Sequence, residues 1–165
     1  MNKRNIILIG MPGAGKSSVG VILAKVLGYE FIDTDLVIQH REKRLLREII
    51  ADEGNEGFLA IENEVNATLE ADKSVIAPGG SAIYGKEAME HFKEIGTIVY
   101  LKLSYEDLAK RLGNLKGRGV VLKEGQTLKD LYDERSKLYE QYAEITVDES
   151  GRDIQGTILA LREQI

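Results

Sequence analysis

The sequence predicts an α/β protein in which helices cover both faces of a mainly five-stranded parallel sheet, giving three layers, α/β/α. Two observations lead to this fold class. Short apolar runs rich in β-branched residues alternate with longer segments that carry a helical pattern. The runs are apolar throughout, which is typical of strands covered on both faces, and a parallel crossover needs a connection as long as a helix. A length of 165 residues fits one domain, so we treat residues 1–165 as a single unit.

The expected strands follow one another along the whole chain. They span residues 5–9, 30–33, 74–77, 97–103 and 145–147. The segments between them are expected to be mostly helical. Two segments depart from the alternation, because about 36–72 is a long, mostly helical insertion and about 113–125 is a loop rich in glycine and lysine. Both are placed to close over a ligand, since loops of this length often serve as active-site lids.

The first expected strand leads directly into a phosphate-binding motif. Residues 10–17 read Gly-Met-Pro-Gly-Ala-Gly-Lys-Ser, a complete Gly-x4-Gly-Lys-Ser sequence in the strand, loop and helix context that it requires. Lys16 reaches the β- and γ-phosphates, the Ser17 hydroxyl is placed to bind Mg²⁺, and the following helix directs its positive dipole end at the same anions. We therefore expect a nucleoside triphosphate, held by Gly13, Ala14, Gly15, Lys16, Ser17 and Ser18.

A second polar motif, Asp33-Thr34-Asp35, ends the second expected strand. Strand alternation points both carboxylates to the same side. One of them can act in the Mg²⁺ shell while the other orients an attacking hydroxyl and accepts its proton. The alternative is that Asp35 only caps a helix starting at Leu36. Ligands of parallel sheets bind beyond the carboxyl ends of the strands, so the motifs at these ends are expected to share one crevice: Gly10, Asp33 and Pro78-Gly79-Gly80.

These motifs together resemble the shikimate kinase family. The similarity runs over almost the whole chain and is carried by residues 10–20, Gly-Met-Pro-Gly-Ala-Gly-Lys-Ser-Ser-Val-Gly, and residues 31–35, Phe-Ile-Asp-Thr-Asp. The resemblance implies a nucleoside monophosphate kinase-like fold and the transfer of a phosphoryl group from ATP, with Mg²⁺, to a ring hydroxyl of shikimate. It implies further that Asp33 supports the metal, that Asp35 contacts the acceptor hydroxyl, and that the substrate lies beside Gly79 and Gly80.

Four arginines are similar in position to arginines of that family. The resemblance places Arg111 near the adenine and Arg118 on the transferring phosphoryl group, where it balances the developing charge together with Lys16. It assigns Arg135 to the substrate carboxylate and Arg152 to the adenine loop. For Arg111 and Arg118, a solvated surface position is the alternative.

The chain departs from the family pattern on the acceptor side. The family's second carboxylate-binding arginine is Leu59 here, and an acid of the same segment is Asn55. The third glycine of the substrate turn is Ser81, and Pro78 precedes that turn. Losing a charge-assisted hydrogen bond of about 1.5–3 kcal/mol weakens carboxylate binding about ten- to a hundredfold.

Several functions therefore stay open. Shikimate is the best single acceptor, and the first alternative is another hydroxylated metabolite such as a sugar acid, a polyol or a hydroxy amino acid. Arg41, Arg44 and Arg47 could replace the missing guanidinium, could hold the second phosphate of a nucleoside monophosphate, or could form only the polar face of a helix. A nucleotide-binding protein without turnover is disfavoured because it should have lost Lys16, Asp35 or Arg118.

Composition limits the partners. The net charge is −5 with acids and bases interspersed, so we expect a small-molecule substrate and no nucleic acid. The chain has no cysteine, which excludes disulfides and thiolate metal sites and suits the cytoplasm. The apolar stretch at residues 5–9 is too short for a signal peptide or a membrane span. We expect a cytoplasmic monomer, in which Tyr139 and Tyr142 are packing residues rather than ligands.

Overall fold

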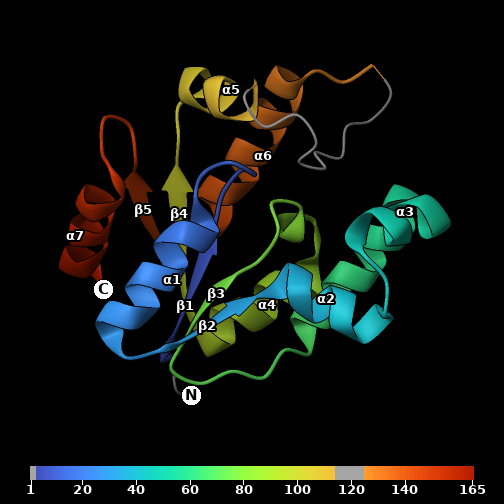
Figure 1. Ribbon diagram of the computed structural model, residues 1–165, viewed down its shortest axis with the longest axis horizontal. Coiled ribbons are helices and arrows are strands. Elements are labelled where there is room, and N and C mark those ends of the chain that lie inside the picture. The colour runs from blue at the N-terminus through green and yellow to red at the C-terminus, as the bar shows by residue number, and fades with distance from the viewer. Residues whose placement is uncertain (1–2, 114–124) are drawn as a thin grey trace.

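Five parallel strands form one sheet in the computed structural model, which describes residues 3–113 and 125–165 (Figure 1). The strand order is β2-β3-β1-β4-β5, and every neighbouring pair is parallel. The strands are β1 (Asn5–Ile9), β2 (Glu30–Asp33), β3 (Ser74–Ala77), β4 (Gly96–Lys102) and β5 (Ile145–Asp148). This sheet confirms the predicted fold class. Relative to the prediction, β4 lies one residue earlier in the chain and β5 is one residue longer.

Helices connect the strands, as parallel crossovers require. They are α1 (Lys16–Leu27), α2 (Thr34–Glu42), α3 (Leu46–Ala67), α4 (Lys86–Ile95), α5 (Tyr105–Gly113), α6 (Leu128–Tyr142) and α7 (Ile154–Gln164), with a 3-10 turn, η1 (Ala82–Tyr84), before α4. Local sequence signals fix several ends. Gly28 ends α1 in the left-handed conformation, and Thr127 and Asp130 form a capping box at the start of α6.

Strand side chains alternate between two apolar layers. On one face, Ile7, Ile76, Ile98 and Tyr100 pack with side chains of α4, α5 and α6. On the other face, Leu8, Val75, Val99 and Leu101 pack with side chains of α1 and α7. Burial on both faces explains why the central strands β1, β3 and β4 are mainly apolar, whereas the edge strands β2 and β5 are more exposed and carry charged residues.

The insertion after β2 has an apolar core of its own. Helices α2 and α3 hold Ile38, Ile49, Phe58 and Val65 between them, and Figure 1 shows both helices extending to one side of the sheet, away from α1 and α7. Gly54, with φ 72°, interrupts the helical geometry inside α3. The insertion is therefore a built helical unit rather than an open loop.

The arrangement places the carboxyl ends of all five strands at one edge of the sheet. The loop before α1, the start of α2 and the turn before η1 all follow such strand ends. None of the helices in the described part of the chain combines the length and the apolar character that a membrane span requires. Because ligands of parallel sheets bind beyond the carboxyl ends of the strands, this edge is the expected place of the functional site.

Candidate active site

The loop after β1 has the backbone geometry of a phosphate cradle. Gly15 precedes α1 with φ 78°, a conformation that glycine adopts freely and other residues rarely adopt. Ala14 is buried, and its N–H donates to the carbonyl of Met11 at 3.0 Å, which closes the loop. Ser17 and Ser18 lie in the first turn of α1, which contains no acidic side chain. The positive end of the helix dipole is therefore available to an anion.

Lys16 and Arg111 bring two positive charges to this loop. Lys16 Nζ donates to the carbonyls of Gly10 and Met11 at 2.8 and 2.9 Å. Arg111, on α5, donates from Nη1 to the carbonyl of Gly13 at 3.0 Å. Two cations held against one glycine loop suit the charge of a triphosphate. The adenine contact expected for Arg111 stays a prediction, since this bond is to the loop itself.

Sequence reasoning missed a buried carboxyl group on the same side. Glu149 follows β5, is 5% exposed, and is fixed by its N–H, which donates to the carbonyl of Lys102 at 2.8 Å. Burial raises the pKa of Glu149 to about 7, and the positive charges of Arg111 and Lys16 oppose this shift. Its Oε2 atom has no hydrogen-bond partner among the described residues. Glu149 therefore changes charge near neutral pH while interacting with both cations of the phosphate loop.

Asp33 and Asp35 lie at the carboxyl end of β2, in an arrangement different from the predicted one. Asp33 caps α2, because its Oδ1 accepts the backbone N–H of Asp35 at 2.9 Å, and the helix begins at Thr34. Asp35 is therefore helical, and the prediction that strand alternation aligns the two carboxylates is wrong. The alternative of Asp35 as cap of a helix from Leu36 is wrong too. Burial raises the pKa of Asp35 to about 6, the charge of Asp33 adds to this shift, and that of Lys16 opposes it.

Two carboxyl groups meet beside Gly79. A Cβ atom at Gly79 would lie 3.0 Å from both Asp35 Oδ1 and Glu62 Oε2, so a larger residue would displace them. Glu62 is 1% exposed on α3, and its Oε1 accepts the hydroxyl of Ser81 at 2.6 Å. Burial raises the pKa of Glu62 to about 7, the Ser81 hydrogen bond opposes the shift, and the charge of Asp35 adds to it. Sequence reasoning gave Glu62 no role.

The next glycine joins this acidic pair to a guanidinium and to the phosphate loop. A Cβ atom at Gly80 would lie 2.7 Å from Pro12 Cδ and 2.9 Å from Arg135 Nη1. Arg135 is 3% exposed on α6, with its guanidinium carbon 5.5 Å from the ring centroid of Tyr84. Tyr139 is buried, as predicted, and its hydroxyl also donates to the carbonyl of Gly80 at 2.7 Å. The glycine turn is therefore held between the two halves of the site.

Position 59 contributes no polar group. Leu59 is partly buried and packs against the apolar cluster of α2 and α3. Asn55, the other departure in this segment, is exposed on the same helix. Leu59 therefore adds only apolar packing to this segment of α3.

The three arginines considered as replacements lie on α2, on α3 and between them. Arg41 forms an ion pair with Glu64 at 2.7 Å, and Arg44 forms one with Asp52 at 3.1 Å. Arg47 is exposed in the first turn of α3. Arg41 and Arg44 are therefore engaged with neighbouring surface acids, as the polar-face interpretation predicts.

Two predicted arginines remain, Arg152 and Arg118. Arg152 is exposed in the loop after β5, where its backbone N–H donates to the carbonyl of Glu149 at 2.9 Å. Ile154, which follows Arg152 closely, is 43% exposed. Arg118 and nearly all of the predicted loop at 113–125 lie outside the described residues.

Ser17 and Asp33 fit a magnesium ion that arrives with a nucleotide. No group of three or more His, Cys, Asp or Glu side chains in residues 3–113 and 125–165 could hold a metal ion by itself. Magnesium in proteins is commonly bound through one or two carboxylates together with substrate phosphates and water. One hydroxyl beside the phosphate loop and one carboxylate at the end of β2 match that requirement.

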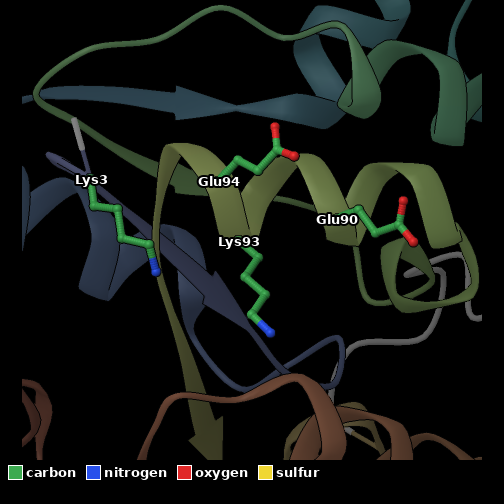
Figure 2. Close-up of a pocket in the computed structure, with 4 residues that line it drawn as sticks. All are labelled: Lys3, Glu90, Lys93 and Glu94. Atoms are coloured by element: carbon green, nitrogen blue, oxygen red, sulfur yellow. The ribbon is translucent and has the colours of Figure 1, made fainter. Parts of the chain in front are cut away.

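A separate surface depression of about 430 Å³ lies next to α4 and the chain entering β1 (Figure 2). It is lined by Lys3, Glu90, Lys93 and Glu94. In Figure 2 the carboxylate of Glu94 extends away from the amino groups of the two lysines. These charges balance in sign, and the depression lies at the amino end of β1, opposite the phosphate loop. It therefore lacks the chemistry of the site described above.

Comparisons with known proteins point to one family. The family model described as "Shikimate kinase" matches residues 12–165. A shikimate kinase of Vibrio cholerae is 36% identical over 168 aligned positions, covering 98% of this chain and 97% of the relative. Shikimate kinase 2 of Yersinia enterocolitica is 34% identical over 154 positions, covering 88% of this chain and 86% of the relative. The structure of a shikimate kinase from Acinetobacter baumannii in complex with shikimate superposes with a TM-score of 0.84 at 32% identity, covering 98% of this chain and 94% of the other.

Proposed function

This chain belongs to the shikimate kinase family, and we propose that the site at the carboxyl edge of its sheet transfers the γ-phosphoryl group of ATP to a hydroxyl of shikimate. The enzyme is an ATP:shikimate phosphotransferase that uses Mg²⁺. One observation carries the assignment of the site. A Cβ atom added at Gly79 would meet Asp35, and one added at Gly80 would meet both Arg135 and Pro12 of the phosphate loop, so the glycine turn lies close to all three. Asp35 for the reacting hydroxyl, Arg135 for the acceptor carboxylate and the phosphate loop for ATP therefore lie next to one another.

On the donor side, the backbone N–H groups of the loop around Gly13 and Gly15 bind the phosphates. Lys16 turns from its two carbonyl partners to the β- and γ-phosphates, and Arg111 adds charge beside Gly13. Ser17 and Asp33 would hold Mg²⁺, which would neutralise phosphate charge when bound. The protein contributes mainly by positioning these groups, because little covalent chemistry is required of it.

On the acceptor side, Asp35 receives the proton. The hydroxyl oxygen attacks the γ-phosphorus, the bond from phosphorus to the bridging oxygen of ADP breaks, and the hydroxyl proton moves to the Asp35 carboxylate. A carboxylate whose pKa is raised to about 6 is still ionised at neutral pH and is a stronger base than an exposed aspartate. Lys16 balances charge in this step, and Arg118 is proposed to do the same.

The acceptor carboxylate is proposed to bind Arg135. This guanidinium is buried, and its Nε atom makes no hydrogen bond to any described residue. A planar fork with a free donor suits a carboxylate. With Leu59 in place of the second arginine, Arg135 is the main cation on the acceptor side. We also propose that Gly79, Gly80 and Ser81 line this side, that the insertion at 36–72 forms its wall, and that Arg152 borders the adenine.

We further propose that the protein works as a cytoplasmic monomer that binds neither nucleic acid nor membrane. All the proposed site residues come from one chain, the net charge is −5, and the chain has no cysteine. Light scattering at working concentration tests the monomer, and a dimer mass would reject it.

The test of function is an ADP-release assay with Mg²⁺ and ATP. Shikimate is compared with its methyl ester and with sugar acids, polyols, hydroxy amino acids and nucleoside monophosphates. We expect shikimate to give the highest kcat/KM. The ester should raise KM at least about tenfold, because it removes the negative charge that Arg135 binds. A higher kcat/KM with another acceptor would reject shikimate as the substrate. If nucleoside monophosphates are the only acceptors in the panel that give ADP release, the mechanism of transfer to a hydroxyl is rejected.

A further inference from the structure

Ser81 uses its hydroxyl in an unusual way for its position. It immediately precedes the η1 turn, where a serine commonly caps the following backbone, yet it makes no such cap. Its hydroxyl instead donates to Glu62 Oε1 at 2.6 Å, a bond between the turn before η1 and helix α3 in which both residues are buried. This distance lies in the range of charge-assisted O–H···O⁻ bonds. Ser81 therefore acts on a carboxyl group distant in sequence.

Glu62 needs such a donor because its own helix supplies none. Residue 59 lies one turn before Glu62 on α3, and residues three apart on a helix are neighbours. A guanidinium at position 59 could therefore reach the Glu62 carboxylate, but Leu59 has no donor and packs against the apolar cluster of α2 and α3. The groups that act on Glu62 from the elements packed around it are Ser81, Asp35 and Arg135.

The second carboxylate oxygen of Glu62 lies beside the glycine turn of the site. Its Oε2 atom has no hydrogen-bond partner among the described residues and would lie 3.0 Å from a Cβ atom at Gly79, the same distance as Asp35 Oδ1. The Ser81 bond on Oε1 fixes the rotation of the carboxyl group. Oε2 is thereby directed to the place where the acceptor hydroxyls meet Asp35.

We infer that Ser81 is a positioning residue that replaces a side-chain donor at position 59, holding Glu62 so that its second oxygen is presented to the acceptor beside Asp35. This inference rests on the proposed function only in naming the acceptor. Ser81 and an arginine at position 59 are thus alternative solutions to one problem, and either should reduce the need for the other.

The experiment is a double-mutant cycle with four proteins: the parent, Ser81→Ala, Leu59→Arg and the double variant. Alanine fits the ordinary backbone of Ser81, φ −88° and ψ −1°, so the variant should fold. We expect Ser81→Ala to raise the KM for shikimate about tenfold with the KM for ATP unchanged, since a hydrogen bond to a charged group is lost. We expect Leu59→Arg to lower that KM, and the effect of Ser81→Ala to fall below about threefold in its presence.

Ser74→Ala is the matched control. Ser74 is also buried, at the start of β3, and its hydroxyl donates to the carbonyl of Asp72 at 3.1 Å, away from the site. It should leave both KM values unchanged. The inference is overturned if Ser81→Ala leaves the KM for shikimate unchanged, or raises it by the same factor with leucine and with arginine at position 59. It is also overturned if the KM for ATP rises as much as the KM for shikimate.

A readout without substrate separates this inference from the proposed function. In ligand-free protein, the titration of the Glu62 carboxyl group is followed by carbon NMR. We expect this group to titrate at higher pH in Ser81→Ala than in the parent, because the hydrogen bond from Ser81 lowers the pKa of Glu62. An unchanged titration rejects the inference. If shikimate is not phosphorylated while the titration shifts, the acceptor assignment fails and the role of Ser81 stands.

Discussion

Asp35 gives the most direct link between a buried charge and catalysis. Burial is the main cause that raises its pKa from 3.8 to about 6. The folded protein therefore holds this proton more tightly than the unfolded chain does. The favourable contribution is complete below about pH 4 and is lost as the pH rises through 6. A shift of about two units corresponds to about 3 kcal/mol, an upper value for the stability that ionised Asp35 costs at pH 8.

Asp35→Asn should therefore separate activity from stability. We expect kcat to fall by about 10²- to 10⁴-fold, because the proton acceptor is gone. The free energy of unfolding in urea should rise by up to about 3 kcal/mol at pH 8 and by only about 1 kcal/mol at pH 4.5, where the folded carboxyl group is already protonated. In the parent, kcat/KM for shikimate should fall tenfold per pH unit below about pH 6.

Asp72→Asn provides the control. Asp72 is exposed beyond the amino end of β3 and pairs with Arg4 through two hydrogen bonds. Its loss should change the free energy of unfolding by about 1 kcal/mol or less, with no gain at pH 8. If Asp35→Asn destabilises the protein equally at both pH values, or if the parent profile is flat from pH 5 to 7, the assignment of Asp35 as a buried base is wrong.

Three further predictions concern the groups around Asp35. Lys16→Met should lower kcat by about 10²- to 10³-fold or more. The control Lys25→Met, at an exposed position of the same helix, should leave kcat unchanged. Substantial ADP release by Lys16→Met would contradict the proposed donor site. Glu149→Gln should tighten ATP binding in calorimetry up to about tenfold at pH 8, where the parent carboxylate repels phosphates, and should have little effect at pH 6; an equal effect at both values would exclude this charge as the cause. Tyr139→Phe should raise the KM for shikimate about fivefold by removing a 2.7 Å bond to the Gly80 carbonyl, and Tyr132→Phe, which removes an equal 2.7 Å bond to the Leu103 carbonyl, should not; matching changes in both variants would reject a specific role for Tyr139.

Much of the fold could be predicted because its signals are local. The central strands are mainly apolar runs and the phosphate motif is contiguous, so the positions of the strands along the chain and the loop before α1 follow from the sequence. The error at Asp33 has a local cause as well. The apolar run of Phe31 and Ile32 favours continuing the strand, but Asp33 bonds its own backbone two residues on and starts the helix there.

The buried acids could not be predicted from local patterns. Glu62 lies 19 residues before Ser81, and an acidic side chain on a helix is usually solvated, so only the tertiary contact reveals it. One signal was available for Glu149, since it directly follows the last strand, where polar residues of parallel sheets gather around ligands. For Glu62, the signal was a serine in place of a glycine together with a leucine in place of an arginine.

The two sides of the site are built differently, and this difference explains where the chain has diverged. The donor side centres on one short loop whose groups are bonded to each other, as Lys16 is to Gly10, and to which Arg111 is also bonded, so a change there disturbs the whole cradle. The acceptor side is assembled from α2, α3, the glycine turn and α6, each contributing one or two side chains. The hydrogen bond that a side chain at position 59 could give to Glu62 can then come from another element, as it does from Ser81, while Asp35 and Arg135 keep their places. If the double-mutant cycle bears out the proposed role of Ser81, the Leu59 and Ser81 pair shows how the acceptor side of this chain can change while the phosphate loop is kept.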